Sequence, residues 1–191
     1  GRLAIVRDPS TVRVGVASTL GTRGQSVKEI ARQYNAVLAI NASGFADENG
    51  VGHGGTVVGL LISEGVKYND ATGGRYLNIG FDKNHRLYIG AGEDEVEYRD
   101  AVQFVPALIV DGENVVAGKK VSSESLGFGL QPRTVIGQAR DGTVLFLTID
   151  GRQIGYSVGT TVVECAAILE RYGAVQAANL DGGSSTVMVY R

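Results

Sequence analysis

Carboxylate, glycine and hydroxyl residues gather in one segment near the end of the chain, Asn179-Leu-Asp-Gly-Gly-Ser-Ser-Thr186. Apolar residues flank it at 174–178 and 187–189, so a buried strand leads into a polar loop. The main-chain N–H groups of such a loop can face an anion while Asp181 points into the same space. The pattern favours an anion site with a carboxylate, and the alternative is an ordinary Asp-Gly turn with polar neighbours.

A second carboxylate and a guanidinium stand at the ends of other predicted strands. Asp150-Gly-Arg152 follows the apolar run 144–149, and Arg133 opens the run 133–138. Arginine suits recognition of phosphate or carboxylate, whereas a surface turn and an exposed edge arginine are the alternatives. Glu164 takes the third position of a predicted helix, where it can cap the helix or act in catalysis.

An internal repeat links two distant parts of the chain. Tyr34-Asn-Ala-Val-Leu-Ala-Ile-Asn-Ala-Ser-Gly44 aligns without gaps with Tyr172-Gly-Ala-Val-Gln-Ala-Ala-Asn-Leu-Asp-Gly182. Each copy has a helix end, a residue that tolerates left-handed geometry, a short apolar strand and then Asn-x-(Ser/Asp)-Gly. We expect the two units to deliver Asn41 and Asn179 to equivalent strand ends, where open sheets place ligands. Coincidence among common residues is the alternative.

Two helices and many short strands must position these residues. The capping boxes Ser26-Val-Lys-Glu29 and Thr161-Val-Val-Glu164 predict helices over about 26–34 and 161–172. Because the sequence contains no linker, we expect one α+β domain over 1–191, with a mixed β-sheet that contains antiparallel hairpins. The predicted strands and their Asp-Gly turns are 11–16, 56–63, 101–110 before Asp111-Gly112, and 133–138 and 143–149 around Asp141-Gly142.

Composition argues against several classes of protein. The 191 residues carry 18 Lys+Arg and 20 Asp+Glu with no long charged block, which argues against a nucleic-acid binder. No apolar run reaches the length of a membrane span. One cysteine, Cys165, excludes an internal disulfide, and with two histidines it makes a His/Cys zinc site unfavourable. Because the chain starts at Gly1 without a leader, we expect a domain excised from a longer protein.

Four segments, taken in their order along the chain, resemble the phosphodiester glycosidase family over about residues 35–190. They are Asn41-Ala-Ser-Gly-Phe45, Pro132-Arg-Thr134, Asp150-Gly-Arg152 and Asn179–Thr186. The resemblance implies hydrolysis of an N-acetylglucosamine-1-phosphate diester, a phosphorylated glycan or cell-wall carbohydrate as partner, and an extracellular or cell-envelope location. The chain has Asn-Ala-Ser-Gly-Phe where the family has Asn-Gly-Gly-Phe-Phe, and Ser184 where it has a third glycine. Both changes alter the loop that borders the sugar.

Glycosidases generally use two carboxylates around an oxocarbenium-like transition state, and Asp181 and Asp150 are the natural pair. We expect Asp181 to act as nucleophile or water-activating base, and Asp150 to orient an arginine or the sugar. A phosphate ester leaves as a stable anion, so Arg133 and the Gly182–Ser185 backbone are expected to hold the phosphate. Glu164 completes the catalytic candidates. The substrate-binding candidates are Asn41, Ser43, Thr134, Arg152, Asn179, Gly182, Gly183, Ser184 and Ser185.

The rival hypothesis is a glycan- or peptidoglycan-binding module of an envelope or phage-like assembly that does not turn its ligand over. Asp181, Asp150, Asn41 and Glu164 could then hold Ca²⁺ or Mg²⁺ through oxygen ligands. The hydrolase hypothesis requires no cofactor, although Ca²⁺ or Mg²⁺ is compatible with it.

Overall fold

The structure is a computed structural model that describes residues 1–46, 54–91, 95–118 and 129–191. Both predicted helices are confirmed, as α1 (Val27–Gln33) and α2 (Val162–Arg171). Each begins with a complete capping box, in which Ser26 or Thr161 accepts from the backbone of the glutamate three residues on. The glutamate carboxylate in turn accepts from the backbone N–H of the capping residue, so two otherwise unpaired donors are satisfied at each helix start.

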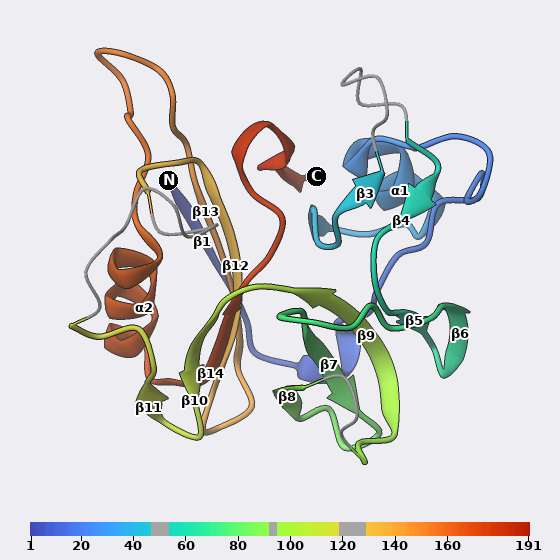
Figure 1. The fold of residues 1–191 in the computed structure, drawn as a ribbon, viewed down its shortest axis with the longest axis horizontal. Helices are drawn as coiled ribbons and strands as arrows, with labels where there is room; N and C mark the ends of the chain where they lie inside the picture. The colour runs from blue at the N-terminus through green and yellow to red at the C-terminus, as the bar shows by residue number, and fades with distance from the viewer. Residues whose placement is uncertain (47–53, 92–94, 119–128) are drawn as a thin grey trace.

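A six-stranded sheet forms the centre of the molecule, and α2 packs on one of its faces (Figure 1). Its strands, in spatial order, are β1 (Arg2–Val6), β13 (Val144–Ile149), β12 (Arg133–Ala139), β14 (Ala174–Asn179), β10 (Ala107–Val110) and β11 (Glu113–Asn114). The predicted hairpin around Asp141-Gly142 is present, because β12 and β13 pair antiparallel from Arg133–Ile149 to Gln138–Val144.

A second sheet and two short strand pairs complete the fold (Figure 1). The five-stranded sheet has the order β6 (Val66–Asn69), β5 (Leu61–Ser63), β9 (Tyr98–Phe104), β7 (Leu77–Asp82) and β8 (Leu87–Ala91). The short pairs are β2 (Leu38–Ile40) with β15 (Met188–Tyr190) and β3 (Phe45–Ala46) with β4 (Thr56–Val57), and the 3₁₀ turns are η1 (Pro9–Thr11) and η2 (Gly183–Ser185). Every strand pair in the described ranges is antiparallel, so the expected mixed sheet is not found there, and the α+β chain is mainly β in content.

The central sheet is buried on both faces. Leu145 and Leu147 of β13 join Cys165 and Leu169 in the core beneath α2. Their neighbours Val144 and Phe146 belong to a second core, which contains Phe81 and Val102 of the five-stranded sheet. Because alternate side chains of a strand point to opposite faces, packing fixes the direction of every side chain along β12 and β13.

Three predicted strands differ from the structure. The expected strand 11–16 does not form, because η1 occupies its start and the following segment is extended without a strand partner. Its N–H groups bind side chains instead, with Val14 donating to Asp100 and Val16 to the Tyr34 hydroxyl. The expected strand 56–63 divides at Gly59, whose φ of +83° no strand adopts, and 101–110 divides before Pro106, which has no N–H to donate.

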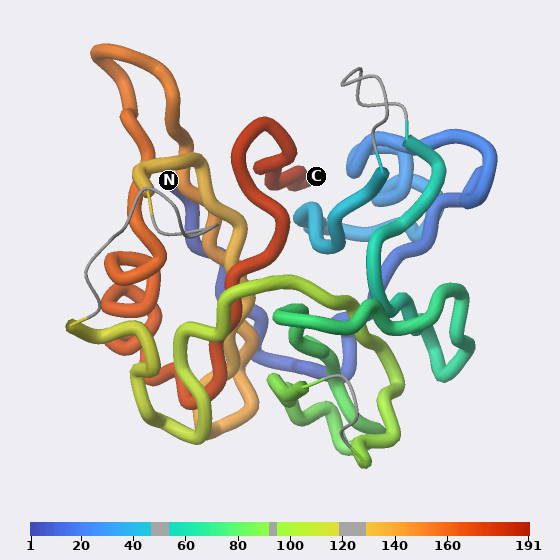
Figure 2. Tube along the Cα trace, in the orientation of Figure 1, coloured from blue at the N-terminus to red at the C-terminus, as the bar shows by residue number. Residues whose placement is uncertain are grey.

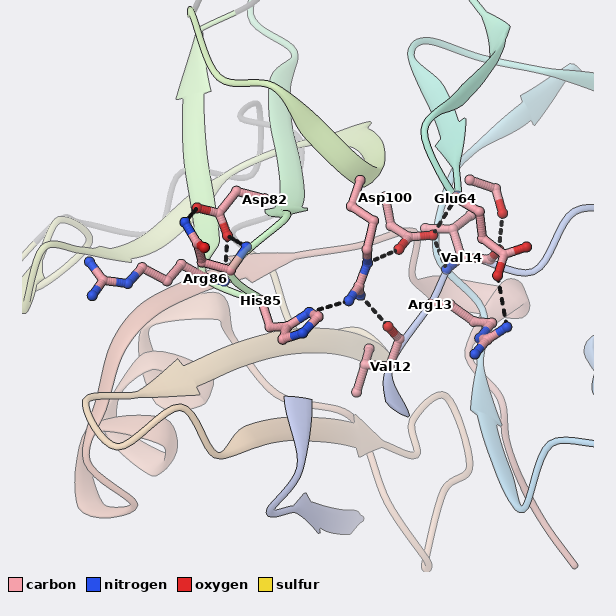
Figure 3. Close-up of polar contacts among 11 residues, drawn as sticks. Val12, Arg13, Val14, Glu64, Asp82, His85, Arg86 and Asp100 are labelled. Carbon is pink, nitrogen blue, oxygen red and sulfur yellow. Dashed lines mark hydrogen bonds and ion pairs between the residues drawn. The ribbon is translucent and has the colours of Figure 1, made fainter. Parts of the chain in front are cut away.

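A polar cluster ties the extended segment after η1 to the five-stranded sheet (Figure 3). The Arg99 guanidinium on β9 donates to Asp100 at 2.5 Å and also contacts the Nδ1 atom of His85 and the carbonyl of Val12. The Asp100 carboxylate, which is 1% exposed, accepts from the N–H groups of Val14 and Glu64 at 3.0 and 3.2 Å. This cluster takes the place of the backbone ladder that a strand at 11–16 would make.

Within the described ranges, neither helix has the length and apolar character needed to cross a bilayer.

Candidate active site

The two loops of the internal repeat lie against each other. Beyond β14 the chain crosses from the central sheet towards α1 and β2, where β15 pairs with β2 (Figure 2). On the way, Asp181 donates its N–H to the carbonyl of Ala42 at 2.9 Å, and the side-chain amide of Asn41 donates to the carbonyl of Asp181 at 2.7 Å. The repeat therefore brings two Asn-x-(Ser/Asp)-Gly loops into direct contact, although their strands belong to different sheets.

The Asn41 side chain joins three segments of the chain. Besides its bond to Asp181, its oxygen accepts from the Thr134 hydroxyl at 2.8 Å and from the Val187 N–H at 3.0 Å. Thr134 is fully buried, so this hydroxyl depends on Asn41 for its partner. Asn41 thus fixes the position of the Asp181 loop relative to β12.

Pro132 lies between two glycines and brings two further motifs to the same place. A Cβ atom on Gly151 would lie 2.7 Å from the Pro132 nitrogen, and one on Gly182 would lie 2.9 Å from the Pro132 oxygen. Both positions exclude a side chain, because real Cβ atoms do not approach so closely. Gly183 also donates its N–H to the Pro132 carbonyl at 3.0 Å. All four motifs, far apart in the sequence, therefore meet at one end of β12 and β14.

Asp181 is the carboxylate at the centre of this junction, and it is half-buried. Burial raises the pKa of Asp181 above its ordinary value of 3.8, while hydrogen bonds from the Ser185 hydroxyl and the Gly182 N–H act in the opposite direction. Such a carboxylate is a stronger base than an exposed one and is held in a fixed orientation. It can act as a nucleophile or as a base towards water.

The structure separates the two candidate arginines. Arg152 is exposed, and its Nη2 atom lies 3.3 Å from the position that a Cβ atom on Gly183 would take. Its guanidinium therefore lies directly against the glycine loop that follows Asp181. An arginine at that place can pair with an anion bound by the loop.

Arg133 is 2% exposed and is bound to the main chain. Its Nε atom donates to the carbonyl of Thr160 at 3.1 Å, and its Nη2 atom donates to the carbonyl of Gly129. Burial lowers the pKa of the Arg133 guanidinium. Its neighbour Thr134 points to the opposite face of β12, where it meets Asn41. The structure thus brings the backbone of Arg133 to the junction, while its guanidinium is engaged by two main-chain carbonyls.

Two other acidic candidates have described contacts of their own. The carboxylate of Asp150 lies 3.3 Å from the amino nitrogen of Gly1 and is 42% exposed. Glu164 accepts from the Thr160 hydroxyl at 2.7 Å and from the Thr161 N–H at 2.8 Å. These hydrogen bonds lower the pKa of Glu164, so its role in the structure is that of a helix cap.

The polar candidates divide into bracing and loop residues. Asn179 is 2% exposed, and its amide donates to the carbonyls of Val105 and Leu180, which fixes the end of β14. Ser43 is half-buried in the turn after β2, whereas Ser184 is exposed in η2. The sequence did not indicate that Pro132 packs between Gly151 and Gly182, or that the Val105 carbonyl accepts from Asn179. Neither Pro132 nor Val105 carries a polar side chain that would mark it as part of a site.

Nucleophilic use of the cysteine is unfavourable. Cys165 is fully buried, and burial raises the pKa of its thiol to about 12, so the reactive thiolate is absent at neutral pH. Within the ranges that the structure describes, no three His, Cys, Asp or Glu side chains are grouped so that they could hold a metal ion.

The model of the phosphodiester glycosidase family matches residues 34–191, which include all four motifs. The chain belongs to the phosphodiester glycosidase family. The expectation from the motifs is thereby confirmed at the level of the family.

Relatives of this family member include proteins from bacteria and vertebrates. The chain is 30% identical over 175 residues to the SPbeta prophage-derived uncharacterized protein YomE of Bacillus subtilis (strain 168), covering 86% of this chain and 26% of that protein. It is 27% identical over 191 residues to the N-acetylglucosamine-1-phosphodiester alpha-N-acetylglucosaminidase of Bos taurus, covering 92% and 35%. The chain thus spans about a third or less of the length of these two relatives.

A solved structure shares the fold. The catalytic domain of the zebrafish N-acetylglucosamine-1-phosphodiester alpha-N-acetylglucosaminidase, auto-inhibited by its pro-peptide, superposes with a TM-score of 0.74 at 19% identity, over 98% of this chain and 62% of that one.

Proposed function

We propose that this phosphodiester glycosidase domain hydrolyses the glycosidic bond of a sugar-1-phosphodiester of the N-acetylglucosamine-1-phosphate type. The observation that carries the proposal is the junction itself, where the half-buried Asp181, the Gly182–Ser185 loop and Arg152 lie together. The named activity of the Bos taurus relative supports the choice of substrate class. A phosphorylated glycan or cell-wall carbohydrate as partner and an extracellular or envelope location belong to the same proposal.

The chemistry assigns a role to each group. Bond cleavage develops positive charge on the sugar and negative charge on the departing phosphate. Asp181 attacks the sugar carbon or takes a proton from the attacking water, and its raised pKa suits it to the second role. Arg152 stabilises the phosphate, so Arg152 takes the part that the sequence suggested for Arg133. The expected role of the Gly182–Ser185 backbone is reduced, because the N–H groups of Gly182, Gly183 and Ser185 already donate to Asp181, Pro132 and Gly182.

The remaining candidates position these groups. Asp150 lies two residues before Arg152 and orients that arginine or the sugar. Asn41 and Asn179 brace the Asp181 loop. The side-chain amide of Asn41 donates to the carbonyl of Asp181, and that of Asn179 donates to the carbonyl of Leu180. No cofactor takes part in the proposed reaction.

The proposal is tested by turnover of sugar-1-phosphodiesters and plain glycosides, with and without EDTA. Asp181→Asn is expected to reduce kcat on the diester by at least about 100-fold, because it removes the base or nucleophile. Asp70→Asn is the matched control, since Asp70 is exposed and pairs only with Lys67 on the described surface, so kcat should not change.

Four outcomes would contradict the proposal. Unchanged turnover in a folded Asp181→Asn protein would show that Asp181 is not the catalytic carboxylate. Activity on plain glycosides alone would show that the phosphate is not required for recognition. Loss of activity in EDTA would favour a metal-dependent site. Binding of the diester without turnover would favour the glycan-binding module.

A further inference from the structure

Residues 150–160, between β13 and α2, form an arm that projects beyond the end of the central sheet (Figure 1). The arm is closed by paired backbone hydrogen bonds of 2.8 and 2.9 Å between Gln153 and Ser157. The Ser157 hydroxyl donates to the carbonyl of Asp150 at 2.6 Å, and Thr160 exchanges backbone hydrogen bonds with Gln131 at the base. These bonds fix the shape of the arm before any ligand binds.

Large apolar side chains are exposed along the 150–160 arm. Ile154 is fully exposed, and Tyr156 and Val158 are 68% and 60% exposed. Leu130, next to the base of the arm, is 56% exposed. Apolar groups gathered in this way on a rigid support are a feature of binding surfaces, whereas single exposed apolar residues are ordinary.

The same arm carries a group of the proposed active site. Arg152 lies against Gly183, and the first exposed apolar side chain, Ile154, follows only two residues later. Beyond Arg152 the arm contains no other charged residue. One cation followed by an uncharged apolar surface is complementary to a ligand with an anionic group and an apolar tail.

A phosphodiester has two substituents, and the proposed function accounts for one of them. The sugar lies on the Asp181 side, because its anomeric carbon must face that carboxylate. The other substituent, the aglycone, is attached to the phosphate that Arg152 holds. The aglycone is thus attached to the group that faces an arginine of the 150–160 arm.

We propose that the 150–160 arm binds the aglycone and that the preferred aglycone is an aliphatic chain. This inference rests on the proposed function, whose substrate it narrows to sugar-1-phosphodiesters whose departing phosphate monoester carries an apolar alkyl group. Ile154, Tyr156 and Val158 are then residues that determine specificity and take no part in bond cleavage.

The test compares kcat/KM for two substrates, the methyl and the octyl diester of N-acetylglucosamine-1-phosphate, with the full protein. The octyl diester is expected to be preferred by at least about tenfold, because each buried methylene favours binding. The double variant Ile154→Ser/Val158→Ser should reduce that preference to less than about threefold. The control Ile5→Ser/Val66→Ser changes two apolar residues outside the arm that are 52% and 54% exposed, and it should keep the preference.

Binding provides a second readout that does not need turnover. Affinities of Asp181→Asn for the two diesters, measured by calorimetry with and without the arm substitutions, should show the same preference and the same loss. Equal kcat/KM values and equal affinities for the two diesters would overturn the inference. So would a preference for the octyl diester that the arm variant keeps. So would an arm variant that changes the oligomeric state and affects both diesters equally, since a second copy would then cover the arm. Failure of both diesters to turn over, with the binding preference intact, would reject the proposed function alone.

Discussion

Arg152 and Arg133 offer a matched test of which guanidinium serves the phosphate. Methionine at either position keeps an unbranched side chain and removes the charge and the hydrogen-bond donors. Arg152 is exposed, so Arg152→Met should change the free energy of unfolding by less than about 0.5 kcal/mol. Its lost charge-assisted hydrogen bond to phosphate corresponds to about 1.5–3 kcal/mol, or a decrease in kcat/KM of about 10- to 150-fold.

Arg133→Met should have the opposite profile. It removes the donor from the carbonyls of buried Thr160 and half-buried Gly129, and two such losses amount to about 3 kcal/mol of unfolding free energy. Urea unfolding measures the stability of both variants, and sugar release from a sugar-1-phosphodiester measures kcat/KM on the folded fraction. If Arg133→Met keeps full stability and loses turnover, while Arg152→Met keeps full turnover, the assignment drawn from the structure is refuted.

Three further substitutions test the junction. Asn41→Ala should lower the free energy of unfolding by about 3 kcal/mol, because the buried Thr134 hydroxyl and two backbone groups lose their partner, while exposed Asn84→Ala should change it by less than about 0.5 kcal/mol in the same urea titration. Glu164→Ala should lower stability by about 1 kcal/mol through loss of the capping box and leave kcat unchanged, and a tenfold decrease in kcat would instead indicate catalysis. Because the folded pKa of Asp181 lies above 3.8, its ionisation destabilises the fold as pH rises through that pKa. Asp181→Asn should therefore have a higher Tm than the wild type at pH 7, and the difference should shrink as the pH falls through the raised pKa; a pH-independent difference would contradict this.

Local sequence signals predicted the elements whose determinants are local. The capping boxes at Ser26 and Thr161 gave both helices, because the residues that satisfy the helix start are three positions apart. Asp141-Gly142 gave the β12–β13 hairpin for the same reason. The prediction of a strand at 11–16 was wrong because the N–H groups of this segment bind the side chains of Asp100 and Tyr34. These residues are distant in the sequence, and alternation of apolar residues does not reveal them.

Within the site, the sequence predicted which segments matter better than which side chains face the loop. The four motifs do meet, as the repeat and the family resemblance suggested. The direction of Arg133 follows from which face of β12 packs on α2, and that choice depends on tertiary packing. The contact of Arg152 with Gly183 depends on the path of the 150–160 arm, which no local pattern specifies.

The hydrogen bond between Asn41 and the Asp181 carbonyl joins positions that are 140 residues apart. During synthesis at about 5–20 residues per second, Asn41 leaves the ribosome roughly 7–28 s before its partner. For that interval β2 has neither its partner strand β15 nor the Asp181 loop to pack against. On the proposed function, the site for the diester can therefore form only after the segment that contains Asp181 has emerged from the ribosome.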